Sequence, residues 1–159
     1  MLLEKACDFA LLNDPIQNER IASVPLHRDS MFFWVDAAHA LAQRKTARLA
    51  DAAGCEVACL SPDEYVSLAP VVERLRAEAP DCRIFYADQM IEVLERALER
   101  RALAITVRSH VGSFPHEGFV GVPIEDASWG FSIAYRCDRS LSLWDEAFLA
   151  HLSSLAVFC

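Results

Sequence analysis

The fold is decided by residues 54–107, which read GCEVACLSPDEYVSLAPVVERLRAEAPDCRIFYADQMIEVLERALERRALAITV. Three short apolar stretches in this passage have the length and composition of buried strands. These stretches are 56–60, 82–86 and 102–107. The segments between them, 61–79 and 88–100, have helical periodicity. Strands joined by helical crossovers lie parallel with right-handed connections, so the passage predicts a layered β-α-β-α-β unit.

The two predicted helices carry start and stop signals. Ser61 is placed as the N-cap of the first helix, with Pro62 at the first helical position and Glu64 completing a capping box. Pro80 marks the end of that helix. Asp88 is placed to cap the second helix, whose charged residues form a solvated face.

Ligands of such sheets meet the carboxyl ends of the strands. A hydroxyl and free N–H groups at the start of the first helix favour a carboxylate ligand there, although capping alone also explains Ser61. Arg108 follows the last strand and offers a fork of donors to an anion, but an exposed loop arginine is an equal explanation. The candidate ligand-binding residues at these strand ends are Ser61, Pro62, Asp63, Arg108, Ser109 and His110.

Outside the central passage, strands and one helix are predicted on both sides. On the amino side, residues 7–12 and 31–35 are strand-like, and Asn13-Asp14-Pro15 forms a turn after the first of them. On the carboxyl side, two strands are predicted at 119–124 and 131–136. A helix capped by Ser142 follows them, with four residues expected to face inward: Phe148, Leu149, Leu152 and Leu155.

Composition restricts the class of protein. A chain of 159 residues with 53% hydrophobic residues can bury a core. Its formal net charge of −8 disfavours nucleic-acid binding by this chain alone. No apolar run approaches the roughly 20 residues of a membrane-spanning helix. The six cysteines are scattered and no leader pattern is present, so we expect a cytoplasmic protein with reduced thiols and no membrane contact.

The cysteines and histidines do not form an ordered catalytic or metal pattern. Cys55 and Cys59 share one side of a strand and suggest a metal site with His110 or His116, but their spacing fits no zinc pattern and buried structural thiols are favoured. Ser109 lacks the glycine-flanked elbow of a hydrolase. We therefore predict no cofactor, no metal and no catalytic residue. The large aromatic residues are expected in the core or in an interface; they are Trp129, Phe131, Trp144 and Phe148.

Several passages, in order along the chain, resemble the effector-binding domain of LysR-type transcriptional regulators. Residues 2–12 resemble the family's stretch "L, a few residues, D-L-A-I". Pro25-Leu26-His27, the strand at 31–35 and His39-Ala40-Leu41-Ala42 resemble its "P-L, strand, H-P-L-A" passage, with Ala40 where proline is usual.

Later passages continue the resemblance. Residues 49–53 resemble the short "L-A-D-L" helix. Residues 97–107 resemble the family's glycine-containing helix and strand, with Arg100-Arg101-Ala102 in place of the glycines and Arg108 in place of proline. The final match is the best, and its parts are 122–126, Trp129, 132–136, 138–142 and 148–149.

The resemblance implies an α/β fold of the periplasmic-binding-protein type 2, with two lobes and a small effector in the cleft between them. The first lobe is expected to be incomplete. Residues 1–35 would form part of it with the first hinge strand, residues 36–118 the second α/β lobe, and residues 119–159 the return hinge strand with a C-terminal strand and helix on the first lobe. Asn13 and Asp14 would face the cleft, although a turn-forming role suits them without any ligand.

The expected function is effector sensing, not catalysis. The predicted partners are a small organic anion and further copies of the chain, whose oligomer geometry would change on binding. DNA would be contacted only through a winged helix-turn-helix segment, which we do not find before Met1. The alternatives are a truncated stand-alone ligand-binding or dimerisation module and, less favoured, a small α/β enzyme using a residue such as Cys59 or His110.

Overall fold

The computed structural model describes residues 1–113 and 117–155. The chain divides into two compact units. Unit 1 consists of Met1–Arg28 and Trp129–Cys159, and unit 2 consists of Asp29–Ser128.

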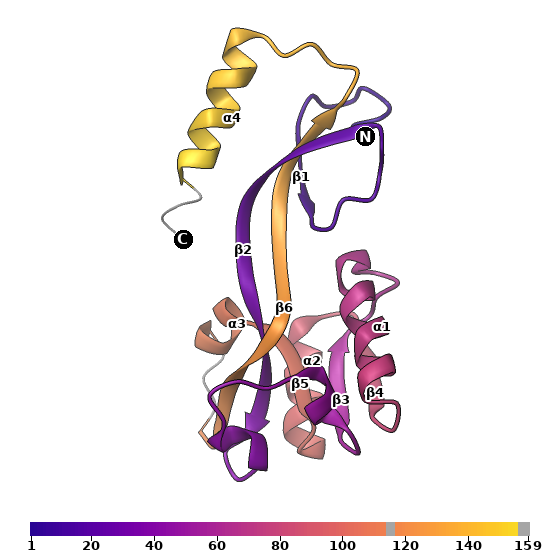
Figure 1. The fold of residues 1–159 in the computed structure, drawn as a ribbon, viewed down its shortest axis with the longest axis vertical. Coiled ribbons are helices and arrows are strands. Elements are labelled where there is room, and N and C mark those ends of the chain that lie inside the picture. The colour runs from indigo at the N-terminus through magenta and orange to yellow at the C-terminus, as the bar shows by residue number, and fades with distance from the viewer. Residues whose placement is uncertain (114–116, 156–159) are drawn as a thin grey trace. The chain divides into compact units, whose positions relative to one another are not determined.

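A six-stranded sheet has the order β1-β6-β2-β5-β3-β4. Its two long strands are β2 (Ile21–Asp36) and β6 (Phe119–Arg136), and each contributes residues to both units (Figure 1). The mixed α/β composition predicted from the sequence is confirmed. The two strands expected after residue 118 are one continuous strand, so that prediction was wrong in detail.

Unit 2 contains the predicted parallel strands β3 (Glu56–Leu60), β4 (Arg83–Ala87) and β5 (Leu103–Val107). β3 lies between the other two and pairs parallel with both, with Leu60 opposite Ala87 and Ala58 opposite Ala104. The β-α-β-α-β prediction is confirmed. β2 pairs antiparallel with β5, along the edge of β5 that does not pair with β3.

The two crossover helices of unit 2 cover opposite faces of β4. α1 (Ala69–Glu78) reaches Tyr86, whose hydroxyl accepts a hydrogen bond from Arg76 at 2.8 Å. α2 (Met90–Arg100) covers the other face, because the Arg100 guanidinium lies 4.7 Å from the ring centre of Phe85. Successive residues of a strand point to opposite faces, so both faces of this sheet are buried. The largest fully buried side chains of this unit include Phe33, Met31, Leu49, Leu75, Leu103 and Val93.

The first crossover helix begins later than predicted. Residues 62–64 form a turn and Val66–Leu68 a 3-10 helix before α1 begins at Ala69, so Ser61 is not its N-cap. Pro70 explains the difference: within a helix starting at Ser61 it would clash with the carbonyl group of Val66 and remove one hydrogen bond. At the start of α1 the same proline is favourable.

The second crossover helix also begins later, at Met90. Gln89, not Asp88, is its N-cap, and no side chain makes the capping hydrogen bond.

The short "L-A-D" segment forms a 3-10 helix at Leu49–Ala52, and another 3-10 helix spans Ala40–Gln43.

Unit 1 contains β1 (Ala10–Asn13), which pairs antiparallel with β6, and α4 (Leu143–Leu155). The predicted cap of α4 is confirmed: the Ser142 hydroxyl accepts from the Asp145 N–H at 3.2 Å, and the Asp145 carboxylate accepts from the Ser142 N–H at 2.9 Å.

The inward face predicted for α4 was wrong in part. Leu149 is buried and Leu152 is half-buried, but Phe148 is 43% exposed and Leu155 is 50% exposed. Trp144, which was expected in the core or in an interface, is 86% exposed. The ring of Phe148 does contact Phe9. The apolar stripe at 144, 148 and 155 is therefore largely uncovered by the described residues.

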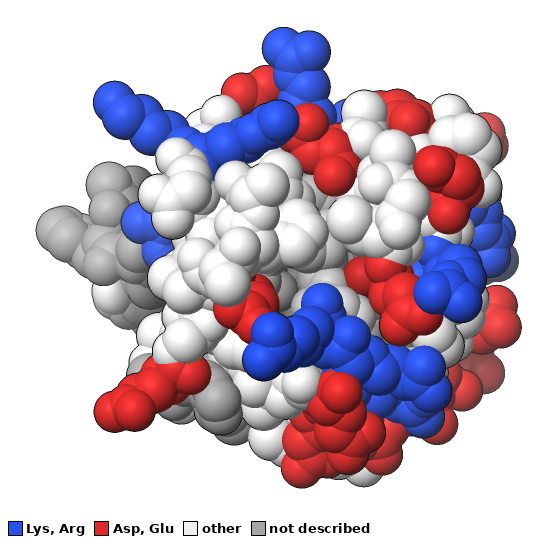
Figure 2. Space-filling model, turned by 90° about the horizontal axis from the view of Figure 1, so that it is seen from below, with Lys and Arg blue, Asp and Glu red and all other residues white. Residues whose placement is uncertain are grey.

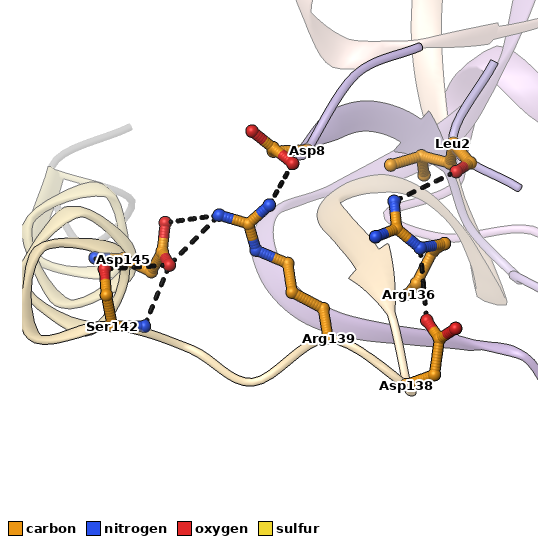
Figure 3. A network of polar contacts seen from close by, with 7 residues as sticks. All are labelled: Leu2, Asp8, Arg136, Asp138, Arg139, Ser142 and Asp145. Atoms are coloured by element: carbon orange, nitrogen blue, oxygen red, sulfur yellow. Dashed lines mark hydrogen bonds and ion pairs between the residues drawn. The ribbon is translucent and has the colours of Figure 1, made fainter. Parts of the chain in front are cut away.

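An arginine network joins the segments of unit 1 (Figure 3). Arg139 donates to both oxygens of Asp145, at 2.9 and 3.1 Å, and also donates to Asp8. Its guanidinium lies 5.2 Å from the centre of the Phe9 ring. This single side chain therefore ties the N-terminal segment to the beginning of α4.

The charged surface is mixed. On the face drawn in Figure 2, Lys and Arg side chains are interspersed with Asp and Glu side chains. Within the ranges that the structure describes, no helix combines the length and apolar character needed to cross a bilayer.

Candidate functional site

The candidate site of unit 2 lies at the carboxyl ends of β3, β4 and β5. The parallel pairing brings these three ends to one edge of the sheet. The Ser61 N–H donates to the carbonyl oxygen of Ala87 at 2.9 Å, which continues the β3–β4 ladder beyond Leu60. Extending the β3–β5 register by three residues from Ala58 places Ser61 beside Val107.

Ser61, Pro62 and Asp63 form a tight turn at this edge. The Ser61 carbonyl accepts the Tyr65 N–H at 2.8 Å, and Asp63 is exposed. Because the helix starts eight residues later, the N–H groups and dipole of a helix start do not favour an anion at Ser61 as predicted. The Ser61 hydroxyl still lies at the end of β3, where it can donate a hydrogen bond to a ligand or accept one from it.

Arg108 is the cationic side chain of this edge. It begins the short helix α3 (Arg108–Ser113), where a loop was expected. Its side chain is exposed, and its guanidinium lies 5.7 Å from the ring centre of Phe32. An aromatic face orients a guanidinium without occupying its N–H donors, so the fork of Arg108 remains available to a carboxylate.

His110 and Ser109 follow Arg108 in α3. His110 is half-buried. The side chain of Ser109 lies outside the described residues.

Asp63 adds a negative charge to the same edge. Burial raises the pKa of Tyr86, and the charge of Asp63 contributes to that rise. The edge therefore combines the exposed cation of Arg108 with the exposed carboxylates of Asp63 and Asp88, and an anion is favoured on the Arg108 side.

Asn13 and Asp14 belong to unit 1. Asn13 ends β1 opposite Phe131, and the Asp14 N–H donates to the carbonyl oxygen of Gly130 at 2.9 Å. The buried hydroxyl of Ser132 donates to both Asp14 oxygens, at 2.8 and 3.0 Å. A pocket of about 640 Å³ lies beside them, and its other lining residues include His27, Arg28, Pro15 and Leu26. The role of Asn13 and Asp14 in effector binding stays a prediction.

The two thiols suggested as metal ligands lie at different places along β3: Cys59 is within the strand, one residue before its carboxyl end, and Cys55 is not near that end. Cys55 directly precedes β3, at the amino end of the strand, whereas His110 follows the carboxyl end of β5. His116 lies outside the described residues. Among the residues that the structure describes, no group of three Cys, His, Asp or Glu side chains is placed to hold a metal ion.

Phe32 is the site residue that sequence reasoning missed. It belongs to an apolar run that predicts a buried strand, but its position beneath Arg108 depends on the antiparallel pairing of β2 with β5, where Phe32 lies opposite Thr106. Local sequence gives no signal for this long-range pairing.

The family model of the LysR substrate binding domain matches residues 1–156. No curated protein matches the sequence significantly. Among solved structures, the fold is similar to the effector binding domain of BenM with its effector benzoate, with a TM-score of 0.79 and 17% identity, covering 99% of this chain and 72% of that one.

Two further solved domains are similar. One is the effector binding domain of QuiR in complex with shikimate, with a TM-score of 0.74 and 18% identity, covering 99% of this chain and 75% of that one. The other is the regulatory domain of CcmR from Synechocystis PCC6803 in complex with 2-PG, with a TM-score of 0.72 and 13% identity. The match covers 98% of this chain and 76% of that one.

The likeness to these domains establishes the periplasmic-binding-protein-like fold. The family match extends over nearly the whole sequence. The chain therefore belongs to the LysR substrate-binding domain family, as an effector-binding domain of transcription regulation.

Proposed function

We propose that this domain senses a small organic anion bound at the carboxyl edge of β3 and β5, with Arg108 as its charge partner. One observation carries the proposal. When the β3–β5 register is extended past Leu60, the turn at Ser61 and Pro62 lies beside Arg108, which follows the end of β5. A carboxylate beside Arg108 would accept two parallel N–H bonds from the guanidinium, and the Ser61 hydroxyl would donate a third. The ligands named for the similar BenM and QuiR domains, benzoate and shikimate, suggest suitable probes.

A ligand screen tests this proposal. We expect at least one small carboxylate from a panel containing benzoate and shikimate to raise the melting temperature, because a ligand at about 100 times its Kd adds about 2.7 kcal/mol to stability. Arg108→Ala should weaken binding of that ligand by about 10-fold to 100-fold in calorimetric titration, since charged hydrogen bonds contribute about 1.5–3 kcal/mol.

Arg96 provides the matched control, because it is exposed on α2 and far along the helix from the proposed edge. Arg96→Ala should leave the affinity unchanged. Equal affinities of wild type and Arg108→Ala, or the absence of any carboxylate ligand across a broad panel, would contradict the proposal.

Sensing is favoured over turnover. Cys59, the thiol considered for nucleophilic catalysis, is 1% exposed, and burial raises its pKa to about 12. A thiol that stays protonated and covered at neutral pH is not a nucleophile. We propose that effector occupancy acts instead on the DNA-binding part of a LysR-type regulator, through its oligomer geometry.

A second candidate function is self-association through α4, and the exposed stripe of that helix supports it. Leu143 is 83% exposed and Trp144 86% exposed. Exposed apolar patches of this kind commonly mark interaction sites. In sedimentation velocity, the double variant Leu143→Ser with Trp144→Ser should shift the protein toward the monomer.

Val66→Ser is the control for self-association, because Val66 is equally apolar and 71% exposed in unit 2. It should leave the sedimentation profile unchanged. A wild-type protein that is monomeric at high concentration would eliminate this candidate.

A further inference from the structure

Two thiols stand at the amino ends of neighbouring parallel strands. Cys55 directly precedes β3 and Cys82 directly precedes β4. Glu56 lies opposite Arg83 in the ladder, and the Arg83 N–H donates to the Cys55 carbonyl at 3.0 Å. One step back along this register, Cys55 lies opposite Cys82.

The spacing across such a ladder suits a disulfide. Neighbouring strands lie about 4.8 Å apart, and disulfides join residues whose Cα atoms are about 4.4–6.8 Å apart. Residues opposite each other in a parallel pair point to the same face, so the two thiols share a side. Each is a half-buried free thiol, which a small reagent can reach.

His39 distinguishes the two thiols. Its Nδ1 accepts the Leu41 N–H at 3.2 Å, which leaves the proton of the neutral ring on Nε2. That Nε2 lies 3.9 Å from the Cys55 Sγ, so its N–H points to the sulfur. A donor at this position favours negative charge on Cys55, and on this ground we assign Cys55 as the attacking thiol and Cys82 as the resolving one.

We propose that Cys55 and Cys82 form an oxidisable thiol pair, a modification site that reacts with a small disulfide such as glutathione disulfide. The Cys55 thiolate attacks one sulfur of glutathione disulfide, forming a mixed disulfide and releasing one glutathione thiolate. The Cys82 thiolate then attacks the Cys55 sulfur, closing the intramolecular disulfide and releasing the second glutathione. Both protons of the two protein thiols leave on the two glutathione molecules, and the protein is oxidised by two electrons.

The charged surroundings set the pH dependence of this reaction. Burial raises the pKa of both thiols, and the charge of Asp81 raises them further. His39 lies beside Cys55, and Arg76 and Cys59 interact with Cys82; the charge of Arg76 lowers the pKa of Cys82 but does not cancel the rise. Because thiolate is the reacting form, we expect the oxidation rate to rise about tenfold per pH unit from neutral pH upward.

The experiment is oxidation of the whole folded chain with glutathione disulfide, followed by peptide mapping without reduction. Trypsin with glutamyl endopeptidase separates Cys55 from Cys59, because cleavage after Glu56 falls between them. The expected product is a cross-link between the Cys55 and Cys82 peptides. Cys55→Ser and Cys82→Ser should each abolish it and leave the other thiol as a mixed disulfide with glutathione.

Two matched variants make the result decisive. Cys59→Ala and Cys137→Ser should retain the cross-link, because Cys59 is buried and Cys137 is exposed in unit 1. If a serine variant unfolds, as circular dichroism would show, Cys55→Ala or Cys82→Ala replaces it. Persistent mixed disulfides at both positions, or a cross-link that uses Cys59 or Cys137, would overturn the proposal.

Discussion

Ser132 donates its buried hydroxyl to both carboxylate oxygens of Asp14, at 2.8 and 3.0 Å. Ser132 is 1% exposed and lies in β6, opposite Leu12 of β1. The contact thus fixes the turn that follows β1 against the neighbouring strand.

Removing this hydroxyl should destabilise the protein. We expect Ser132→Ala to lower the free energy of unfolding by about 1–2 kcal/mol, because a half-buried carboxylate loses its hydrogen-bond donor. Urea denaturation measures the change. Ser154→Ala is the control, since its hydroxyl is exposed on α4 and donates to the His151 carbonyl within its own helix. Equal effects of both substitutions would contradict the assigned role of Ser132.

A second prediction concerns the close approach of two backbones at Gly130. A Cβ atom there would lie 2.6 Å from the carbonyl oxygen of His27 and 3.3 Å from the Asp14 Oδ2. Gly130→Ala must therefore shift a strand, at a cost of about 1–3 kcal/mol in the free energy of unfolding.

Gly112→Ala is the matched control for Gly130. No atom lies within 4 Å of a Cβ at Gly112, which is helical. Alanine is the better helix former, so this variant should be neutral or slightly stabilised. Thermal unfolding should give a lower melting temperature for Gly130→Ala than for Gly112→Ala; similar melting temperatures would contradict the prediction.

The regular part of the fold could be predicted from sequence. The strand at 56–60 has the predicted bounds, and the strand ending at Val107 begins one residue late. Both are apolar runs between helices, a pattern whose only compact arrangement is a parallel layered sheet. The edge that gathers Ser61 and Arg108 follows from that topology alone.

Other features could not be predicted from local patterns. β6 continues through residues 125–130, where a break between two strands was predicted; the passage begins with Glu125 and Asp126, polar residues typical of such a break. The position of Phe32 beneath Arg108 needs the pairing of strands distant in sequence. The late start of α1 could have been predicted, because Pro70 stands inside the helix that the capping pattern suggested.

A third prediction concerns Arg101, the C-cap of α2, which has a φ of 52° in the left-handed region. Glycine adopts this conformation without steric cost. Arg101→Gly should therefore raise the free energy of unfolding by about 0.5–1 kcal/mol. Its ion pair with Asp36, at 3.7 Å with the arginine side chain 81% exposed, contributes little.

Arg100→Gly should have the opposite sign to Arg101→Gly. Arg100 is the last residue within α2, where glycine lowers helix stability by about 1 kcal/mol. The role of Arg101 as a left-handed C-cap is supported if the denaturant midpoint of Arg101→Gly lies above that of wild type and the midpoint of Arg100→Gly lies below it. Two destabilised variants would refute this role.

The fourth prediction concerns the acid sensitivity of the α4 cap. The Ser142 N–H, followed by the Arg139 guanidinium, holds the pKa of Asp145 below its ordinary value of 3.8. A lowered folded-state pKa contributes stability above the unfolded-state pKa, and this contribution disappears as the pH falls through the folded-state pKa. Asp145→Asn should therefore be less stable than wild type at pH 7, and the difference should shrink below about pH 4.

Urea midpoints measured from neutral pH down to about pH 3 test this sign. Once Asp145 is protonated it resembles the neutral amide, so the two curves should converge in acid. Glu95→Gln is the control, because Glu95 is exposed on α2 and away from the cap. Its midpoint should follow that of wild type at every pH. A difference between Asp145→Asn and wild type that stays constant into acid would mean that the carboxylate charge of Asp145 does not stabilise the start of α4.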